Sequence, residues 1–353
     1  MKKIVHVIDT LSIGGAELLL KNSIELLPEY EHIVAYLNEP DELRKEVWNS
    51  HVHFINLQHT GWTKIFNTAR QLRKVIKFAK PSIVHSHLFV STICARLATP
   101  KSVRLVSSIH SIYSKDAFHK NIKSLLAEKL TLRERHTIIA VSKFVLNDYL
   151  CYVPFAGKRF VLYNFLPNGS FVEEQVKLTK NSLRCVAVGN LKEAKNYQYL
   201  FDIWEEIKQQ DISLDIYGTG ALEAELKVMI RKKGLNIKLC GRASNVQNLL
   251  RQYDLFVQAS THEGFGLSVI EAIASRVPVL ISDIPVFSEI TSNHAHFFPL
   301  TDSKKATEIL LDLYVNQESR NRHVADAYAF CKQTFSADAF KQKLLTIYQI
   351  NSK

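Results

Sequence analysis

Short apolar runs alternate with helical stretches along almost the whole chain, and this alternation constrains the fold more than any other feature. Apolar runs rich in Val, Ile and Leu, separated by helices, are typical of a parallel β-sheet with helices on both faces. In the first half we expect strands at 3–8, 32–37, 52–57, 83–85, 104–109 and 137–141, with helices at 16–27 and 62–78.

The alternation weakens once, between Asn164 and Ser182, where Pro167, Asn168 and Gly169 form a typical linker sequence. It then restarts. Strands are expected at 184–188, 213–217, 236–239, 255–258 and 277–282, helices at 197–209, 221–233, 246–253 and 268–275, and a further turn from 284 to 289. A chain of 353 residues has room for two domains. We predict a first domain at 1–165 and a second at 166–336, with a C-terminal helix, 337–353, that can pack back on the first.

Composition argues against several classes of protein. Five scattered cysteines form no Cys-x-x-Cys pair, so neither a zinc site nor a disulfide framework is indicated. The apolar run from Ile4 to Ile8 is shorter than the roughly 7–15 residues of a secretory signal. The uncharged stretch between Lys80 and Arg96 is shorter than the roughly 20 residues of a membrane span. No Asp-x-Asp pair is present. We expect a cytoplasmic protein with reduced thiols, no cofactor and no required metal ion.

Positive charge is concentrated in the first half. The net charge is +11, and residues 1–165 hold 23 basic and 13 acidic residues against 22 and 21 in the remainder. Two basic runs contribute most: Arg70, Arg73, Lys74, Lys77 and Lys80, then Lys115, Lys120, Lys123, Lys129, Arg133 and Arg135. A one-sided basic surface suits anionic lipid headgroups, so peripheral contact with the inner face of the cytoplasmic membrane is predicted. A solvated helix face is the alternative. Nucleic acid is not expected, because no recognition motif accompanies the charge.

Glycine turns stand between expected strands and helices. Gly14-Gly15 and Gly218-Thr219-Gly220 each precede a helix, where free N–H groups and the helix dipole favour an anion. Lys195 follows Gly189 by six residues, which places a cation near the end of a strand. Each pattern alone is weak, since a tight turn needs glycine anyway and surface lysines are common.

The strongest pattern runs from His262 to Ala272. Glu263 follows an apolar strand, glycines at 264 and 266 open a helix, and Glu271 lies within an otherwise apolar helix. A carboxylate on a buried helix face needs a partner or a ligand, and sugar hydroxyls are suitable donors. We interpret the two carboxylates as anchors for sugar and ribose, with a helix cap plus an exposed Glu as the alternative.

Taken together, these motifs resemble glycosyltransferase family 4, the retaining enzymes of GT-B fold. The matching pieces are Gly14-Gly15-Ala16-Glu17, His85-Ser86-His87, His110, Val141-Ser142, Asn164, Gly189 to Lys195, Gly218-Thr219-Gly220, Glu263-Gly264-Phe265-Gly266 with Glu271, and Pro278 to Asp283. The resemblance implies an α/β fold of two facing Rossmann-like domains with a cleft between them.

The resemblance also implies roles for individual residues. Glu271 would hold the ribose hydroxyls, Glu263 the donor-sugar hydroxyls, and His110 would lie beside the reacting sugar. Lys195 and Gly15 would hold the diphosphate. Of His85 and His87, one is expected to be a satisfied core histidine. The implied catalytic residues are His110, Glu263 and Lys195; the implied donor-binding residues are Gly14, Gly15, Asn190, Lys195, Gly218, Arg242, Glu263, Gly264, Phe265, Gly266, Leu267 and Glu271.

The family usually has an arginine where this chain has Asn190. An amide supplies no charge, so leaving-group stabilisation would rest on Lys195, helix dipoles and, if it substitutes, Lys192.

The implied reaction moves a hexose-type sugar, with retention and by front-side displacement, from a nucleotide-sugar to a glycan or lipid-linked acceptor in surface polysaccharide synthesis. Uridine is the commonest base. Two alternatives remain: a UDP-sugar epimerase of the same fold, and a non-catalytic nucleotide-sugar-binding protein, which Asn190 favours.

Overall fold

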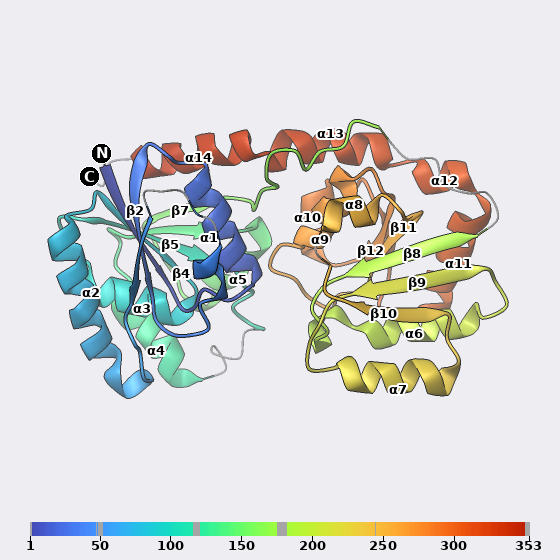
Figure 1. The fold of residues 1–353 in the computed structure, drawn as a ribbon, viewed down its shortest axis with the longest axis horizontal. Helices are drawn as coiled ribbons and strands as arrows, with labels where there is room; N and C mark the ends of the chain where they lie inside the picture. The colour runs from blue at the N-terminus through green and yellow to red at the C-terminus, as the bar shows by residue number, and fades with distance from the viewer. Residues whose placement is uncertain are drawn as a thin grey trace. The chain divides into compact units, whose positions relative to one another are not determined.

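The chain folds into two compact units, one formed by Met1–Phe165 with Ala337–Lys353 and the other by Leu166–Ser336. The structure, a computed structural model, describes residues 2–46, 48, 52–115, 121–174, 182–243 and 245–349. Each unit is a parallel sheet with helices on both faces (Figure 1), which confirms the α/β class expected from the alternating pattern.

The first unit contains a seven-stranded sheet in the order β3-β2-β1-β4-β5-β6-β7. Its strands are β1 (Lys2–Ile8), β2 (Tyr30–Tyr36), β3 (Val52–Asn56), β4 (Ile83–His87), β5 (Arg104–Ile109), β6 (Thr137–Ala140) and β7 (Lys158–Val161). All neighbouring strands pair in parallel, with β1 in register with both β2 and β4. The strand order therefore reverses at β1, so the loops that follow β1 and β4 diverge there.

Two layers of helices bury this sheet. Helices α1 (Gly15–Glu25) and α14 (Ala337–Gln349) share one core cluster with Ile4, Val106 and Phe165, and Phe165 stacks on Phe340 at 4.3 Å between ring centroids. Helices α2 (Ile65–Ala79) and α3 (Phe89–Ala98) pack on the opposite face, and α4 (Ile122–Thr131) and α5 (Lys143–Tyr152) continue that layer. Two short 3₁₀ helices, η1 (Glu42–Lys45) and η2 (Trp62–Lys64), lie in loops.

The second unit contains a six-stranded sheet in the order β10-β9-β8-β11-β12-β13. Its strands are β8 (Leu183–Val188), β9 (Ile212–Tyr217), β10 (Ile237–Gly241), β11 (Leu255–Gln258), β12 (Val279–Ser282) and β13 (His296–Phe298). One face is covered by α6 (Tyr197–Glu206), α7 (Glu223–Lys233) and α11 (Ser303–Val315). The remaining helices are α8 (Val246–Leu250), α9 (Leu267–Ala274), α10 (Pro285–Thr291), α12 (Gln317–Asn321) and α13 (Val324–Phe335).

Some elements of the first unit were not expected from the sequence. Helix α3 is buried at nearly every position, so it lacks the polar face by which an amphipathic helix is recognised. Strand β7 has the sequence KRFV and lies at the sheet edge, where charged residues are tolerated. Helix α4 is missed for another reason: three of its apolar side chains point outward.

Candidate active site

The loops after neighbouring strands lie side by side at the carboxyl edge of the second unit's sheet. Gly189 follows β8, Gly218 follows β9, and Arg242 follows β10. The Gly189 N–H donates to the Tyr217 carbonyl at 2.9 Å, and the Gly218 N–H donates to the Gly241 carbonyl at 2.8 Å. Strand order reverses between β8 and β11, and open α/β sheets bind ligands at such a reversal.

The glycine pattern 218–220 has a packing reason. A Cβ at Gly218 would lie 1.9 Å from the Gly189 carbonyl oxygen, and one at Gly220 would lie 2.4 Å from the Leu191 oxygen. These loops touch backbone to backbone, so a side chain at either position would force them apart. The pattern therefore shapes the edge of the site, whatever the site binds.

Lys195 and Glu263 meet at the strand reversal. Lys195 ends the short helix η4 (Glu193–Lys195) after β8, and Glu263 lies in the loop after β11. Lys195 Nζ is 2.7 Å from Glu263 Oε1, and the two side chains are 10% and 14% exposed. The Thr261 N–H donates to the Ala194 carbonyl at 2.9 Å, which ties the two loops together. The structure thus joins two residues that the sequence analysis placed in separate roles.

A polar chain holds one oxygen of Glu263. Glu263 Oε1 accepts from Gln258 Nε2 at 3.1 Å and from Ser260 Oγ at 2.9 Å, and Ser268 Oγ donates to Gln258 Oε1 at 2.8 Å. Among the described residues, no hydrogen bond ends on Oε2. One oxygen is therefore fixed and the other remains for a ligand. Sequence reasoning missed Gln258 and the serines; a glutamine ending an apolar strand was the available sign.

The charge state of Glu263 follows from its neighbours. Burial alone would raise the pKa of the carboxyl, but the Lys195 charge and its hydrogen bond hold that pKa below its ordinary value. Ser260 and the exposed Lys192 act in the same direction. Glu263 is therefore an ionised acceptor, suited to hydroxyl donors.

Glu271 was expected on a buried helix face. It lies on α9 among buried neighbours, and its own side chain is half-buried. Burial of the carboxyl raises its pKa to about 7, while Lys195 lowers it in part. No described cation forms an ion pair with Glu271. The group is thus divided between its two forms near neutral pH.

The turn that opens α9 was expected to present N–H groups. Gly266 adopts φ +101°, and a Cβ there would lie 2.8 Å from Phe287 Cε1, so both conformation and space require glycine. Among the described residues, no side chain caps α9, which begins at Leu267. Gly264 and the buried Phe265 complete the turn. The uncapped helix start directs donors toward the same edge of the sheet as Glu263.

The remaining residues expected in this unit are exposed. Asn190, Lys192 and Arg242 all point to solvent at the strand ends. The Asn190 carbonyl accepts from the Lys192 N–H at 2.9 Å, so the amide side chain is not needed to shape the loop. The site therefore has Lys195 as its buried cation and two exposed cations at its margin.

In the first unit, the Gly14-Gly15 turn already contains a carboxylate. Glu17, in the first turn of α1, accepts hydrogen bonds from Thr10 Oγ1 at 3.1 Å and Ser12 Oγ at 3.2 Å. A Cβ at Gly14 would lie 2.4 Å from Glu17 Oε2. A diphosphate at this helix start would meet a buried carboxylate, a feature that the glycine pattern did not reveal. The assignment of Gly14 and Gly15 to the donor remains a prediction.

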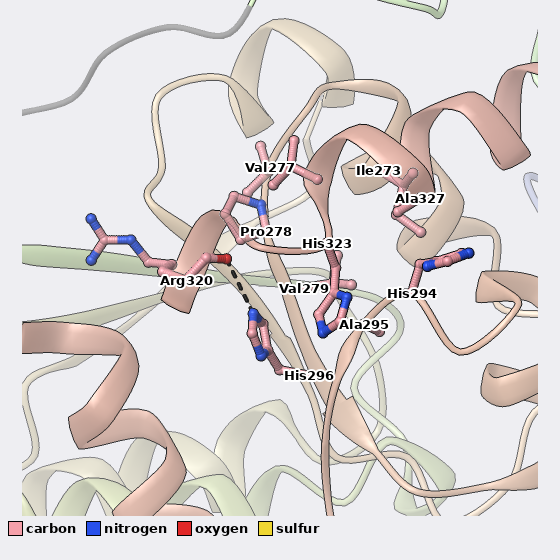
Figure 2. Close-up of a pocket in the computed structure, with 11 residues that line it drawn as sticks. Ile273, Val277, Pro278, Val279, His294, Ala295, His296, Arg320, His323 and Ala327 are labelled. Atoms are coloured by element: carbon pink, nitrogen blue, oxygen red, sulfur yellow. Dashed lines mark hydrogen bonds between the residues drawn. The ribbon is translucent and has the colours of Figure 1, made fainter. Parts of the chain in front are cut away.

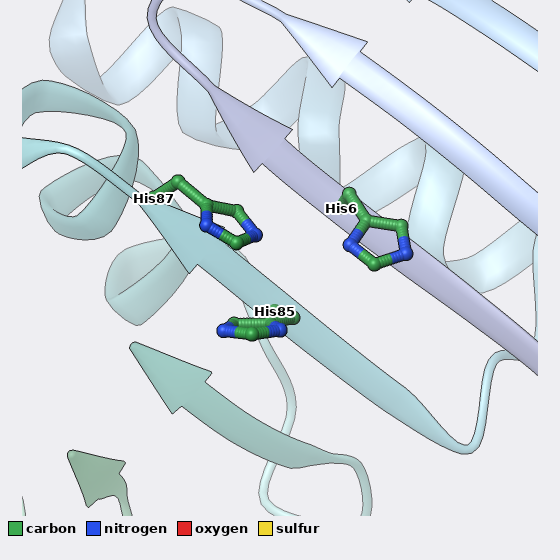
Figure 3. Close-up of side chains that lie close together, drawn as sticks. All are labelled: His6, His85 and His87. Carbon is green, nitrogen blue, oxygen red and sulfur yellow. The ribbon is translucent and has the colours of Figure 1, made fainter. Parts of the chain in front are cut away.

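His110 belongs to a histidine cluster in the first unit. Its Nε2 lies 3.4 Å from His87 Nδ1, and burial lowers the pKa of His110 to about 4. Figure 3 shows His6, His85 and His87 gathered on one face of strands β1 and β4. His85 is the satisfied core histidine: its ring nitrogens bond to Tyr348 Oη at 2.7 Å and Ser108 Oγ at 2.8 Å.

The hydrogen bonds link His6 to His32. His32 Nε2 donates to the Leu27 carbonyl, 2.9 Å away, and a neutral imidazole would then accept at Nδ1. His6 Nε2 lies 3.1 Å from that atom, and among the described residues the buried His6 Nδ1 has no hydrogen-bond partner. His6, His85 and His87 are the described residues that could share a metal ion, their ligand atoms lying within 4.8 Å of one another. Binding would cost His85 one of its two hydroxyl bonds.

A separate small pocket lies at the opposite edge of the second sheet. Figure 2 shows His294, His296 and His323 around it, with His296 Nε2 3.1 Å from the Arg320 carbonyl. Its free volume, about 10 Å³, has room for about one water molecule. It is lined by the start of β12 and not by the carboxyl ends of the strands. It is therefore not the site for a sugar nucleotide.

Comparison with known proteins agrees with this geometry. The second unit matches the family described as glycosyl transferases group 1 over residues 171–330, and the first matches glycosyltransferase family 4 over residues 13–167. The capsular polysaccharide biosynthesis glycosyltransferase CapH of Staphylococcus aureus is 26% identical over 307 residues, covering 82% of this chain and 84% of CapH. The O-antigen biosynthesis glycosyltransferase WclY of Escherichia coli is 21% identical over 362 residues, covering 98% of each.

Among solved structures, Anabaena HepE in complex with UDP and glucose superimposes with a TM-score of 0.82 at 17% identity, covering 99% of this chain and 100% of HepE. This likeness shows the GT-B fold. With both units matched, the chain belongs to the family 4 glycosyltransferases and is a transferase. Within its described residues, no helix has the length and apolar character to cross a membrane.

Proposed function

We propose that this glycosyltransferase moves a hexose from a UDP-sugar to a glycan or lipid-linked acceptor, with retention of configuration, in the synthesis of a surface polysaccharide. The observation that carries the donor assignment is the Lys195–Glu263 pair beside Glu271 at the strand reversal of the second unit. HepE, of the same fold, was solved with UDP and glucose, and the names of CapH and WclY place those relatives in polysaccharide biosynthesis.

Each group at this edge suits one part of the donor. Glu271, when ionised, accepts from the ribose hydroxyls, and Glu263 Oε2 accepts from the sugar hydroxyls. Lys195 and the uncapped start of α9 face the diphosphate. Because Lys195 already neutralises Glu263, its charge is shared between the carboxylate and the phosphates. The exposed Lys192 and Arg242 can add charge at the margin.

Retention follows from attack on the face that the diphosphate leaves. The sugar C1–O bond to the phosphate breaks as the acceptor oxygen forms its bond to C1, and the acceptor proton passes to the departing phosphate oxygen. Negative charge grows on the diphosphate, so the cation and N–H donors that face it contribute most to the rate. His110, neutral because its pKa is about 4, can accept or donate a hydrogen bond beside the sugar. No step requires a metal ion.

The acceptor side includes a proposed membrane contact. The described part of residues 59–159 holds 17 basic and 3 acidic residues, and it belongs to the first unit. A peripheral position on the inner face of the cytoplasmic membrane would bring the enzyme to lipid-linked acceptors.

A screen of nucleotide-sugars tests the reaction. The purified protein is incubated with UDP-, GDP- and ADP-sugars, with and without lipid-linked acceptors, and products are identified by mass spectrometry. We expect UDP release coupled to a glycosylated acceptor, with NMR showing the anomeric configuration of the donor retained. An epimerised or free sugar formed at the same rate without acceptor would support an epimerase instead.

A further inference from the structure

Helix α4 carries an apolar ridge on its outward face. Ile122, Leu126 and Leu130, each one turn apart, are 66%, 49% and 67% exposed. Surface helices of water-soluble proteins ordinarily place such residues toward the core. Here the residues turned inward are Ser124 and Glu128, both buried.

A buried ion pair fixes this orientation. Glu128 Oε2 is 2.8 Å from Arg96 Nη1 on α3, and Glu128 Oε1 accepts from Tyr149 Oη on α5 at 2.6 Å. The ion pair with Arg96 and the hydrogen bond from Tyr149 hold this face of α4 inward, because turning the ridge toward the core would break both and leave a buried charge without its partner. The ridge is thus a stable feature of the fold.

The surroundings of the ridge are positive. Lys123 and Lys129 flank it, and among the described residues neither forms an ion pair, while the helix's acid, Glu128, is neutralised inside. Helix α3 packs between α4 and α2. Lys120, which belongs to the same basic run, lies outside the described residues.

Helix α2, in the same helical layer, also carries exposed apolar and basic side chains. It presents Phe66 and Phe78, 68% and 92% exposed, between Arg70, Lys74 and Lys77, and has no acidic residue. Large exposed apolar side chains together with Lys and Arg are typical of helices that lie in a membrane interface.

A groove opens at the C-terminal end of the ridge. It has a volume of about 690 Å³ and is lined by Lys129, Arg133 and Arg159, together with the apolar Pro154 and Phe155 and one acid, Glu134. The guanidinium groups bond to the Leu132 and Phe155 carbonyls at 2.9 and 2.8 Å, which holds them at the groove. Three cations against one carboxylate favour a phosphate-bearing group.

We propose that α4 inserts its ridge into the surface of an anionic bilayer, and that the groove beside it receives a lipid phosphate headgroup. This rests on the membrane contact of the proposed function and names the element that makes it. An anionic lipid surface satisfies both the apolar ridge and the unpaired lysines. A second copy of the chain would not, since the two basic faces would repel each other.

Vesicle sedimentation tests the proposal with three proteins: the full chain, the ridge variant Ile122→Ser/Leu126→Ser/Leu130→Ser, and a control, Val228→Ser/Val315→Ser. The control removes two exposed apolar residues of the second unit. Vesicles contain phosphatidylcholine alone or with phosphatidylglycerol, at low and high salt. We expect the full chain and the control to bind the anionic vesicles, with part of the binding surviving high salt. The ridge variant should partition at least about tenfold more weakly, because transfer of three aliphatic side chains is lost.

Insertion of the ridge into the bilayer is measured by tryptophan fluorescence. Emission of Leu126→Trp should be quenched by brominated lipids, and that of Val228→Trp should not. Equal partitioning of the ridge variant and the full chain, absence of binding by the full chain, or no selective quenching would overturn the proposal. The proposal would also be overturned if the full chain formed a dimer that the ridge substitutions disrupt, while vesicle binding stayed unchanged. UDP binding is measured by calorimetry on the full chain and on every variant. If the full chain did not bind UDP, that result would count against the proposed function and not against the membrane proposal.

Discussion

Lys195 and Glu263, from the loops after β8 and β11, form one ion pair at the point where the strand order of the second unit reverses. Because the pair is largely buried, neither charge is independent of the other. A ligand that binds there meets a cation already partnered and a carboxylate with one free oxygen.

Replacing Lys195 with Met should lower kcat by about 10²–10³ and should raise KM by a smaller factor, because the lysine charge is needed most as the diphosphate departs. It should also reduce the free energy of unfolding by about 3–5 kcal/mol, since Glu263 keeps a buried charge without its cation. Adding Glu263→Gln should recover most of that stability and none of the activity. Lys304→Met, at an exposed position of α11, is the matched control. A Lys195→Met enzyme with unchanged kcat would remove this residue from the mechanism.

Replacing Asn190 with Arg should leave activity unchanged or raise it. The amide side chain is exposed and the loop is held by its backbone, so a longer cation fits without disturbing the fold. Steady-state kinetics on both proteins measure the effect. Turnover found only in the arginine variant would identify the natural protein as a binding protein, whereas loss of activity with the fold intact would show that Asn190 has a role of its own.

Glu271→Gln should make the unliganded protein more stable at alkaline pH. The folded-state pKa of Glu271 is raised from 4.5 to about 7, so the folded state holds its proton longer and loses stability as pH rises through that window. Glutamine removes the effect, a gain of about 1–3 kcal/mol at pH 8 that vanishes near pH 4.5. Urea denaturation at both pH values measures it. A variant no more stable than the natural protein at pH 8 would contradict the account of this carboxyl.

The first unit should lose stability in mild acid. Burial lowers the pKa of His6, His85, His87 and His110 below 6.5, so the unfolded chain takes up protons first as pH falls from about 6.5 toward 4. Each histidine contributes up to about 1.4 kcal/mol per pH unit in that window. Pulsed hydrogen exchange after incubation at pH 5 should show opening of β1 and β4. His110→Asn should reduce the pH slope by about one proton, and equal stability at pH 5 and 7.5 would refute the prediction.

The alternation of apolar runs and helices predicted both sheets, because buried parallel strands such as 104–109 and 255–258 appear in the sequence as short runs of mainly apolar residues. It also placed Lys195 and Glu263 near strand ends. It did not predict that they pair, since that contact depends on the order β8-β11, which only tertiary packing determines. Glu17 is only three residues from Gly14, but the return of its carboxylate to the turn depends on the rotamer that Thr10 and Ser12 hold. The contact between His6 and His32 joins neighbouring strands and was not predictable from either residue alone.

Titration calorimetry with UDP tests the central claim most directly, that the carboxyl edge of the second unit binds the nucleotide of the donor. The natural protein and the control Glu318→Ala, an exposed position on α12, should bind UDP with equal affinity. Glu271→Ala should bind at least about tenfold more weakly, because the ribose hydroxyls lose a charged acceptor. Unchanged affinity in Glu271→Ala, or no binding of any nucleoside diphosphate by the natural protein, would contradict the account.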